Sequence, residues 1–151
     1  MQQAGAAPVG GFEQGEFVLP LRVYHADTDA GGVMHHAAYM QFAERGRVEM
    51  LRALGWSVGP QAGCNFVVRD AHVEWHAPAR LDDLLACRIG VVQIGAAHVV
   101  MTHRFAIADD PPVFDARITL INVSARLRAV RIPAGLRQAL QQRLAEVEGS
   151  G

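Results

Sequence analysis

The sequence contains no lysine. All fourteen of its basic residues are arginines, and with fifteen Asp and Glu residues they leave a formal net charge of −1. A biased genome composition explains the missing lysine better than selection for phosphate binding, although arginine side chains remain available for phosphate groups. Because a nucleic-acid partner usually demands a strongly basic surface, we do not expect DNA or RNA to be the main partner.

Cysteine and long apolar runs are also scarce. The two cysteines, Cys64 and Cys87, are too few for a disulfide framework and suit a reducing cytosol, which is where we expect the protein. No run approaches the ~18 apolar residues of a membrane span, and residues 1–16 lack the basic and apolar regions of a secretory signal. A chain of 151 residues favours one domain, able to bury a core without metal or disulfide.

The first half of the chain divides into an arm, a strand and a helix. Residues 1–15 are rich in Gly, Ala and Gln without periodicity, so we expect a mobile arm before a single domain over 16–148. Residues 16–25 predict a strand, with Pro20 at a sheet edge or strand start. Residues 37–54 predict a helix that ends at Gly55. Its apolar face includes Gly46, which is tolerable where a sheet approaches the helix closely.

The second half is rich in strands. Alternating or continuous apolar runs predict strands over 65–76, 84–94, 97–108 and 113–124, and helical spacing returns over 133–148. The short connections favour antiparallel, meander-like pairing. The sequence therefore predicts an α+β fold in which one antiparallel sheet curls around one central helix.

Titratable side chains gather in the stretch YHADTDAGGVMHHAAY, residues 24–39. No Ser, Thr, Asp or Asn stands directly before the helix to cap it. Uncapped N–H groups at a helix start can hold a developing oxyanion. Asp29, on the preceding loop, could act there as a nucleophile or general base, and His36 could donate to the same carbonyl or orient the carboxylate.

Two other interpretations of this stretch stay open on spacing alone. Asp-Thr-Asp-Ala-Gly-Gly is also good turn chemistry, because Asp side chains close turns and Gly accepts positive φ. His25, Asp27, Asp29, His35 and His36 supply enough ligands for zinc or iron. The metal interpretation is weaker, since no HxxxH or HExxH spacing is present and adjacent histidines rarely reach one ion.

The segment RVYHADTDAGGVMHHAAYMQFAERGRVEMLRALG resembles the signature of the 4-hydroxybenzoyl-CoA thioesterase family of hotdog-fold enzymes. Within the family it is most similar to the acyl-CoA thioesterases associated with the bacterial Tol–Pal system. The similarity continues through FVVRDAHVEWHAPARLDDLL and, more weakly, through the last strands. The hotdog fold agrees with the strand and helix order predicted above.

The resemblance implies roles for individual residues. It places the catalytic carboxylate on Asp29 and the family's histidine on His36, with the N–H groups near His35 and His36 polarising the thioester carbonyl. Asp27 and Thr28 would shape the turn, while Tyr24 and His25 would line the mouth. Relatives commonly have an aromatic residue at the place of His35, so the lining of the acyl pocket is expected to differ here.

The implied activity is hydrolysis of an acyl-CoA thioester to coenzyme A and a carboxylic acid, without a metal or redox cofactor. Asp29 would attack the carbonyl to form a mixed anhydride, or would activate water. The resemblance also implies a homo-oligomer, a tetramer built from dimers, and allows an acyl carrier protein as the thioester carrier. The alternatives are a non-catalytic acyl-binding or scaffold module and a metal-dependent hydrolase.

Other polar residues have less specific interpretations. Several arginines could contact the phosphates of coenzyme A: Arg69, Arg80, Arg126, Arg128 and Arg131. We expect this contact for Arg69 and Arg128. Charged side chains that protect an edge strand from pairing explain these arginines about equally well. Cys64 has no histidine partner and is expected to be a buried or loop thiol. Four histidines on the predicted strands are read as surface groups: His72, His76, His98 and His103.

Overall fold

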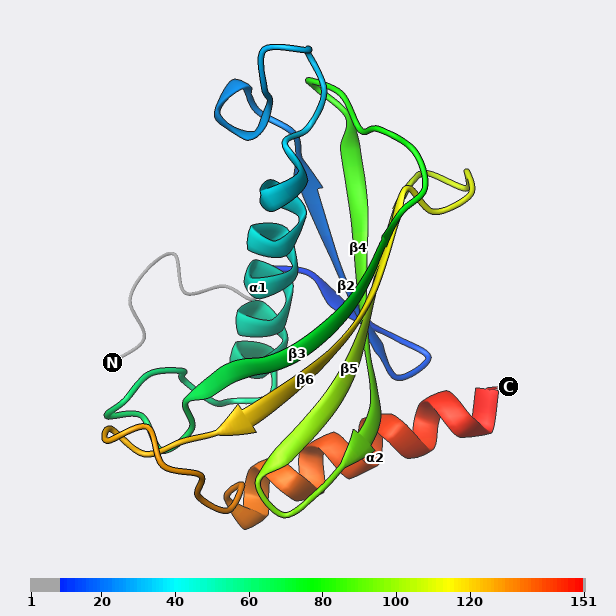
Figure 1. Ribbon diagram of the computed structural model, residues 1–151. Coiled ribbons are helices and arrows are strands. Elements are labelled where there is room, and N and C mark those ends of the chain that lie inside the picture. The colour runs from blue at the N-terminus through cyan, green and yellow to red at the C-terminus, as the bar shows by residue number, and fades with distance from the viewer. Residues whose placement is uncertain (1–8, 151) are drawn as a thin grey trace.

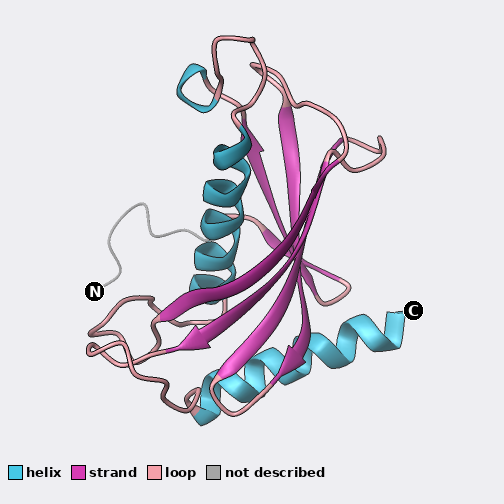
Figure 2. Ribbon diagram, viewed as in Figure 1, coloured by secondary structure: helices cyan, strands magenta, loops and turns pink. Residues whose placement is uncertain are grey.

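The computed structural model describes residues 9–150 and shows an α+β fold in which a single sheet curls around one long helix (Figure 1, Figure 2). In chain order the elements are β1 (Gly11–Glu13), β2 (Glu16–Arg22), the 3₁₀ turn η1 (His25–Asp27), α1 (His36–Ala53), β3 (Phe66–Trp75), β4 (Leu84–Ile94), β5 (His98–Ile107), β6 (Phe114–Asn122) and α2 (Ala134–Ser150). The predicted fold class is confirmed. The predicted elements agree to within two residues at either end, except that β2 ends three residues early.

The sheet is antiparallel, with strand order β1-β2-β4-β5-β6-β3. The meander prediction is right for β4, β5 and β6 and wrong for β3, which pairs with β6 rather than with β4. The reason lies in residues 76–83, which follow β3. The backbone of this segment is hydrogen-bonded to the loop before α1: the Met34 N–H donates to the Ala79 carbonyl at 2.7 Å. The chain therefore crosses the start of the helix before β4 begins.

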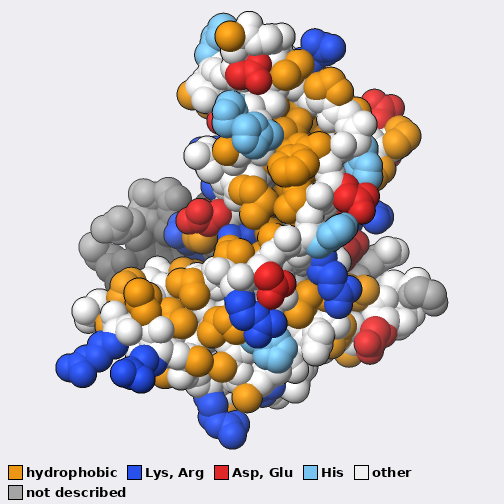
Figure 3. Space-filling view, in the orientation of Figure 1, with side chains coloured by type: hydrophobic (Ala, Val, Ile, Leu, Met, Phe, Trp, Pro, Cys, Tyr) orange, Lys and Arg blue, Asp and Glu red, His pale blue; other side chains and the backbone are white. Residues whose placement is uncertain are grey.

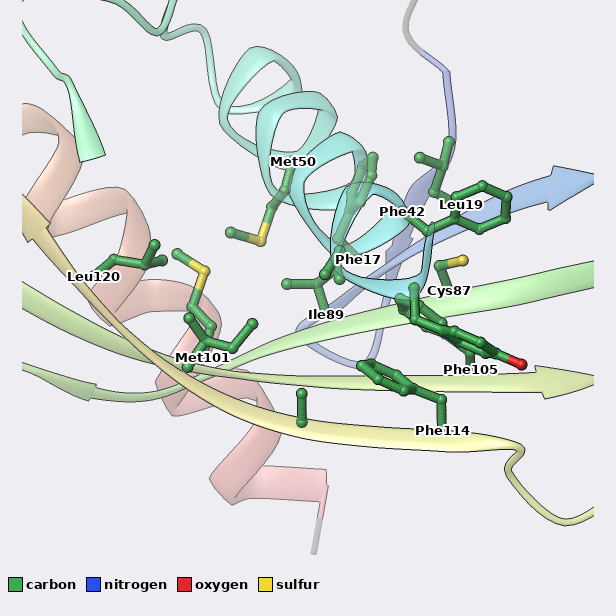
Figure 4. Close-up of a cluster of buried hydrophobic side chains, with 14 of the residues drawn as sticks. Phe17, Leu19, Phe42, Met50, Cys87, Ile89, Met101, Phe105, Phe114 and Leu120 are labelled. Atoms are coloured by element: carbon green, nitrogen blue, oxygen red, sulfur yellow. The ribbon is translucent and has the colours of Figure 1, made fainter. Parts of the chain in front are cut away.

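The core lies between α1 and the concave side of the sheet. Figure 4 shows Phe42 and Met50 of the helix among side chains from β2, β4, β5 and β6. At Gly46 a Cβ atom would lie 2.8 Å from the Cδ1 atom of Ile89. The expected close approach of the sheet is therefore present, and the contacting group is a side chain of β4. Gly55, with φ of +88°, ends the helix as predicted.

The N-terminal segment differs in part from the predicted arm. Residues 1–8 lie outside the described residues, but Gly11–Glu13 form β1 and pair with β2 from Glu16 to Val18. Pro20, farther along β2, lies beyond this pairing and, among residues 9–150, has only β4 beside it, opposite Ala86. The edge position predicted for Pro20 is thus confirmed. A proline lacks the N–H that a second neighbour would require.

Helix α2 lies at the opposite end of the molecule from the η1 loop (Figure 1). It packs on β4 and on the β1–β2 hairpin, and it buries Leu136 and Leu140 completely. The Arg143 guanidinium lies 3.9 Å from the centre of the Phe12 ring, which ties the helix to β1. The opposite end, where β2, α1 and the 76–83 loop meet, is left open for a site.

Candidate active site

The loop between β2 and α1 is organised by Asp27. Its carboxylate Oδ2 accepts the Tyr24 N–H at 2.9 Å, and its carbonyl accepts the His35 N–H at 2.7 Å. The Thr28 hydroxyl donates to the His25 carbonyl at 2.8 Å. Asp27 is buried, so its own bonds are partly shielded from water. The prediction that Asp27 and Thr28 shape the turn is confirmed.

The 76–83 loop closes over the start of α1. The Tyr39 hydroxyl of the helix accepts the Ala79 N–H at 3.1 Å, and Val33 pairs with Arg80 in an isolated β-bridge. Tyr39 itself is buried and stacks on Phe114, with ring centres 5.1 Å apart. Two loops distant in the sequence are thereby held together by the first turn of one helix.

Between the two loops lies an open cleft of about 380 Å³. It is lined by Asp29, Val33, Met34, His36, Tyr39, Trp75, His76, Ala77 and Pro78. Asp29 is exposed, and one of its oxygens, Oδ1, accepts the Gly31 N–H at 2.8 Å. Asp29 therefore does stabilise the turn, as the turn interpretation predicts. This role leaves Asp29 available for catalysis, because its second oxygen, Oδ2, has no hydrogen-bond partner in residues 9–150.

The expectation of an uncapped helix is wrong. His35 is the N-cap, and its Nδ1 atom accepts the Ala37 N–H at 3.1 Å. The His35 N–H bonds to Asp27, and the Ala38 N–H bonds to the His35 carbonyl at 2.9 Å. Among the described residues, the His36 N–H is left without an acceptor at this helix start. One backbone donor, rather than a group of them, therefore remains for a ligand.

Aromatic rings form one wall of the cleft. The His36 ring meets the edge of Trp75 at 6.4 Å between centres, and Trp75 in turn packs on Phe114 at 5.9 Å. Trp75 is 49% exposed although it is large and apolar. Figure 3 shows a hydrophobic surface beside histidine side chains in the upper part of the molecule. Such a wall suits an apolar group next to the Asp29 carboxylate.

His76 also lines the cleft, and sequence reasoning had treated it as a surface group. Its Nε2 atom lies 3.0 Å from the Asp115 carboxylate Oδ2, and the other oxygen of Asp115 accepts the Arg104 Nε–H at 2.9 Å. The only local signal was a histidine at the end of the strand predicted over 65–76. Its partner Asp115 is on β6, so the contact between the two side chains depends on the pairing of β3 with β6.

The predicted substrate-binding residues lie outside the cleft lining. Tyr24 is 65% exposed beside η1, and His35 stacks on His36 at 4.4 Å without lining the cleft. Arg69 lies at the bulge of β3 and pairs with Asp70 at 3.0 Å, while Arg128 belongs to the exposed turn that Ser124 closes. Their contacts with substrate stay predictions. His25 is likewise exposed and lies outside the lining.

The two thiols are buried and unreactive by environment. Burial raises the pKa of Cys64 and raises that of Cys87 to about 12. Cys64 Sγ–H donates to the Ser57 carbonyl at 3.3 Å, as expected of a structural thiol. Within residues 9–150, no three His, Cys, Asp or Glu side chains are grouped to hold a metal ion, and no helix is long and apolar enough to cross a membrane.

Comparison with known proteins identifies relatives of this chain. The family model described as the thioesterase-like superfamily matches residues 23–140. The acyl-CoA thioester hydrolase YbgC of Escherichia coli strain CFT073 is 40% identical over 109 residues, which cover 71% of this chain and 81% of the relative. The acyl-CoA thioesterase YbgC of Haemophilus influenzae is 38% identical over 91 residues, covering 58% and 67%.

Solved structures of thioesterases have the same fold as this chain. A probable thioesterase from Bartonella henselae superposes with a TM-score of 0.73 at 30% identity, covering 77% of this chain and 98% of that one. The DHNA-CoA thioesterase from Staphylococcus aureus reaches a TM-score of 0.81 at 16% identity, covering 90% and 95%, and this likeness concerns the fold alone. The hotdog fold implied by the sequence is confirmed. The chain belongs to the thioesterase-like superfamily.

Proposed function

We propose that this protein hydrolyses acyl-CoA thioesters to coenzyme A and a carboxylic acid, with Asp29 as nucleophile or general base. The family and the 40%-identical acyl-CoA thioester hydrolase support the reaction. The observation that carries the site is one cleft in which an exposed carboxylate oxygen of Asp29 accompanies His36, whose backbone N–H has no acceptor in the described chain.

The chemistry follows from these groups. A thioester carbonyl bound at the start of α1 receives a hydrogen bond from the His36 N–H and a second one from the His36 ring. Both bonds strengthen as negative charge develops on the carbonyl oxygen. The free Oδ2 of Asp29 then attacks the carbonyl carbon to form a mixed anhydride, or removes a proton from an attacking water. The acyl group lies against the Trp75 wall.

Replacing Asp29 by Asn tests the assignment. The Asn side-chain oxygen still accepts the Gly31 N–H, so the turn persists while the charge is lost. Turnover of acyl-CoA should fall by at least ~100-fold, measured as thiol release with circular dichroism as a check of folding. Asp109→Asn, at an exposed turn between β5 and β6, is the matched control and should retain full activity. A folded Asp29→Asn enzyme with near-normal turnover would contradict the proposal.

The substrate range and assembly are part of the same proposal. We expect an acyl-CoA substrate, with acyl carrier protein as a second thioester carrier, in a cytoplasmic homotetramer built from dimers that is associated with the Tol–Pal system. A panel of short, long and aromatic acyl-CoA thioesters, each compared with the same acyl group on acyl carrier protein, identifies the preferred substrate. A scaffold role without catalysis predicts that no member of the panel is hydrolysed.

The proposed mechanism needs no metal. EDTA should leave turnover unchanged, and elemental analysis of the purified protein should find no stoichiometric ion. Loss of activity with EDTA that is restored by zinc would instead favour the metal-dependent hydrolase considered from the sequence.

A further inference from the structure

We propose that His76, held by Asp115, is the proton donor to the departing sulfur of the thioester. This inference rests on the proposed function, since it assigns a further catalytic residue to the same cleft. His76 lines the cleft together with Asp29 and His36, but it follows β3 directly, whereas Asp29 and His36 come from the β2–α1 loop and the start of α1. It therefore approaches a bound thioester from a different element of the fold.

The structure holds the His76 ring in one orientation. Its backbone N–H donates to the Val113 carbonyl at 2.8 Å, and its Nε2 atom lies 3.0 Å from Asp115 Oδ2. Asp115 is itself fixed by the Arg104 Nε–H at 2.9 Å. One further carboxylate, Glu74, lies 3.9 Å from His76 Nε2.

With Nε2 directed to Asp115, Nδ1 is the ring nitrogen that remains available to a bound thioester. Nδ1 has no hydrogen-bond partner in residues 9–150. A histidine that is bonded to a carboxylate through one nitrogen and open at the other is the usual arrangement of a proton-transferring group. Asp115 then acts as the positioning residue.

The reaction needs such a donor if Asp29 is the nucleophile. The tetrahedral intermediate can expel either the Asp29 carboxylate or the thiolate. An aspartic acid ordinarily has a pKa of about 3.9 and an alkyl thiol one of about 8.5, so the carboxylate is the better leaving group. Without protonation of sulfur, the intermediate returns mostly to substrate. A proton delivered to sulfur as the carbon–sulfur bond breaks directs it forward.

The proton balance closes over the two steps. Asp29 Oδ2 bonds to the carbonyl carbon, the carbon–sulfur bond breaks, and the Nδ1 proton of the His76 imidazolium passes to sulfur. This step produces the mixed anhydride, neutral coenzyme A thiol and neutral His76. Water then attacks the anhydride while Nδ1 takes one of its protons, which restores the imidazolium and the Asp29 carboxylate and releases the carboxylic acid.

The test compares two leaving groups on His76→Gln. One substrate is an acyl-CoA, whose alkyl thiol needs a proton, and the other is the same acyl group on thiophenol, a more acidic thiol whose departure depends less on protonation. His76→Gln should lower kcat about 100-fold on acyl-CoA and change it little on the thiophenyl ester. Asp115→Asn should show the same substrate dependence with a smaller loss, about tenfold, and an altered pH–rate profile.

Controls separate this inference from the proposed function. His72→Gln, an exposed histidine on the same strand that pairs with Glu74 at 3.1 Å, should behave like the unchanged protein on both substrates. Asp29→Asn should lose turnover on both the acyl-CoA and the thiophenyl ester. Near-normal acyl-CoA turnover by His76→Gln, or equal losses on the two leaving groups, would overturn the role of His76 while leaving that of Asp29 standing. Should His76→Gln fail to fold, Asp115→Asn decides by the same comparison.

Discussion

At the scale of single residues, His36 is the member of the site whose role is most open to measurement. It supplies a ring and a backbone N–H at the start of α1, so His36→Ala removes only the ring. Losing one such donor costs at most roughly 10²–10³-fold in turnover. The loss should not exceed that of Asp29→Asn, and kcat should change more than KM. Normal kcat with only a raised KM would show that His36 stabilises the bound substrate and the transition state equally, and the catalytic role would be wrong.

A second residue of interest at this scale is His103, which the sequence predicts to be a surface group and which is instead fully buried between β5 and α1. Its Nε2 atom accepts a hydrogen bond from an N–H of the Arg47 guanidinium at 3.3 Å. Burial, and secondarily the charge of Arg47, lowers the pKa of His103 to about 3. Burial also lowers the pKa of Arg47. In the folded protein the histidine is therefore neutral at any pH near 7, and it is expected to become charged only when the chain unfolds.

This difference predicts how stability depends on pH. The unfolded chain binds a proton at His103 below its ordinary pKa of 6.5, whereas the folded chain binds it only near pH 3. The free energy of unfolding should therefore fall as the pH drops through this window. Between about pH 7.5 and pH 5, the stability difference between the unchanged protein and His103→Gln should shift by about 2 kcal/mol.

Urea unfolding at several pH values measures this shift. His72→Gln, at an exposed position, is the control and should show little change across the same range. A pH-independent difference between the unchanged protein and His103→Gln would mean that His103 is charged or accessible in the folded state.

At the scale of elements, α1 and β4 are matched through Gly46 and Ile89. Alanine at position 46 favours the helix by about 1 kcal/mol, but its Cβ would lie 2.8 Å from Ile89 Cδ1 and 3.1 Å from Cγ1. Ile89 is completely buried, so it has little room to move. Helix propensity and core packing therefore oppose each other at one contact.

A double-mutant cycle separates the two effects. Ile89→Val removes the Cδ1 atom and alone should cost about 0.5–1.5 kcal/mol. In a Gly46→Ala background it should cost less, with a coupling of at least ~0.5 kcal/mol. Additive effects in denaturant unfolding would show that β4 does not restrict the size of residue 46.

At the scale of the whole molecule, β3 is an edge strand with exposed apolar side chains. Val67, Val68 and Trp75 are 38%, 46% and 49% exposed, and one side of the strand has no partner in the described chain. A long edge strand of this kind is a ready site for pairing with another chain. This observation supports the proposed homo-oligomer, with β3 in the interface between two copies.

Charge on this edge should weaken the assembly. Val68→Lys is tolerable in a single chain because Val68 is already 46% exposed, yet it places a cation in an interface between two copies. Light scattering after gel filtration should show a dimer or tetramer for the unchanged protein and a shift toward the monomer for Val68→Lys. Leu127→Lys, at an exposed turn, is the control. An unchanged mass for Val68→Lys would place the interface elsewhere.

The amino-acid sequence by itself determined strands β2 to β6, both α-helices and the location of the loop that carries Asp29, but not β1, whose residues it placed in an arm. The strands and helices followed because hydrophobic periodicity and the glycine at position 55 act over only a few residues. The resemblance assigned Asp27 and Thr28 to the turn, and the hydrogen bonds from the Tyr24 N–H to Asp27 and from the Thr28 hydroxyl to His25 each span only three residues. Local interactions of this kind can be recognised from neighbouring residue types.

Only the tertiary structure decided which distant groups meet. It paired β3 with β6, which placed His76 against Asp115 and brought Trp75 and His76 to the cleft of Asp29. The cap formed by the His35 ring was missed for a different reason: its bond to the Ala37 N–H spans only two residues, but histidine is not among the usual N-cap residue types. Strand order depends on long-range packing around α1, and a short connection such as residues 76–83 is compatible with more than one pairing. The physical reason is that these contacts arise from the closure of the sheet around the helix, a property of the whole chain.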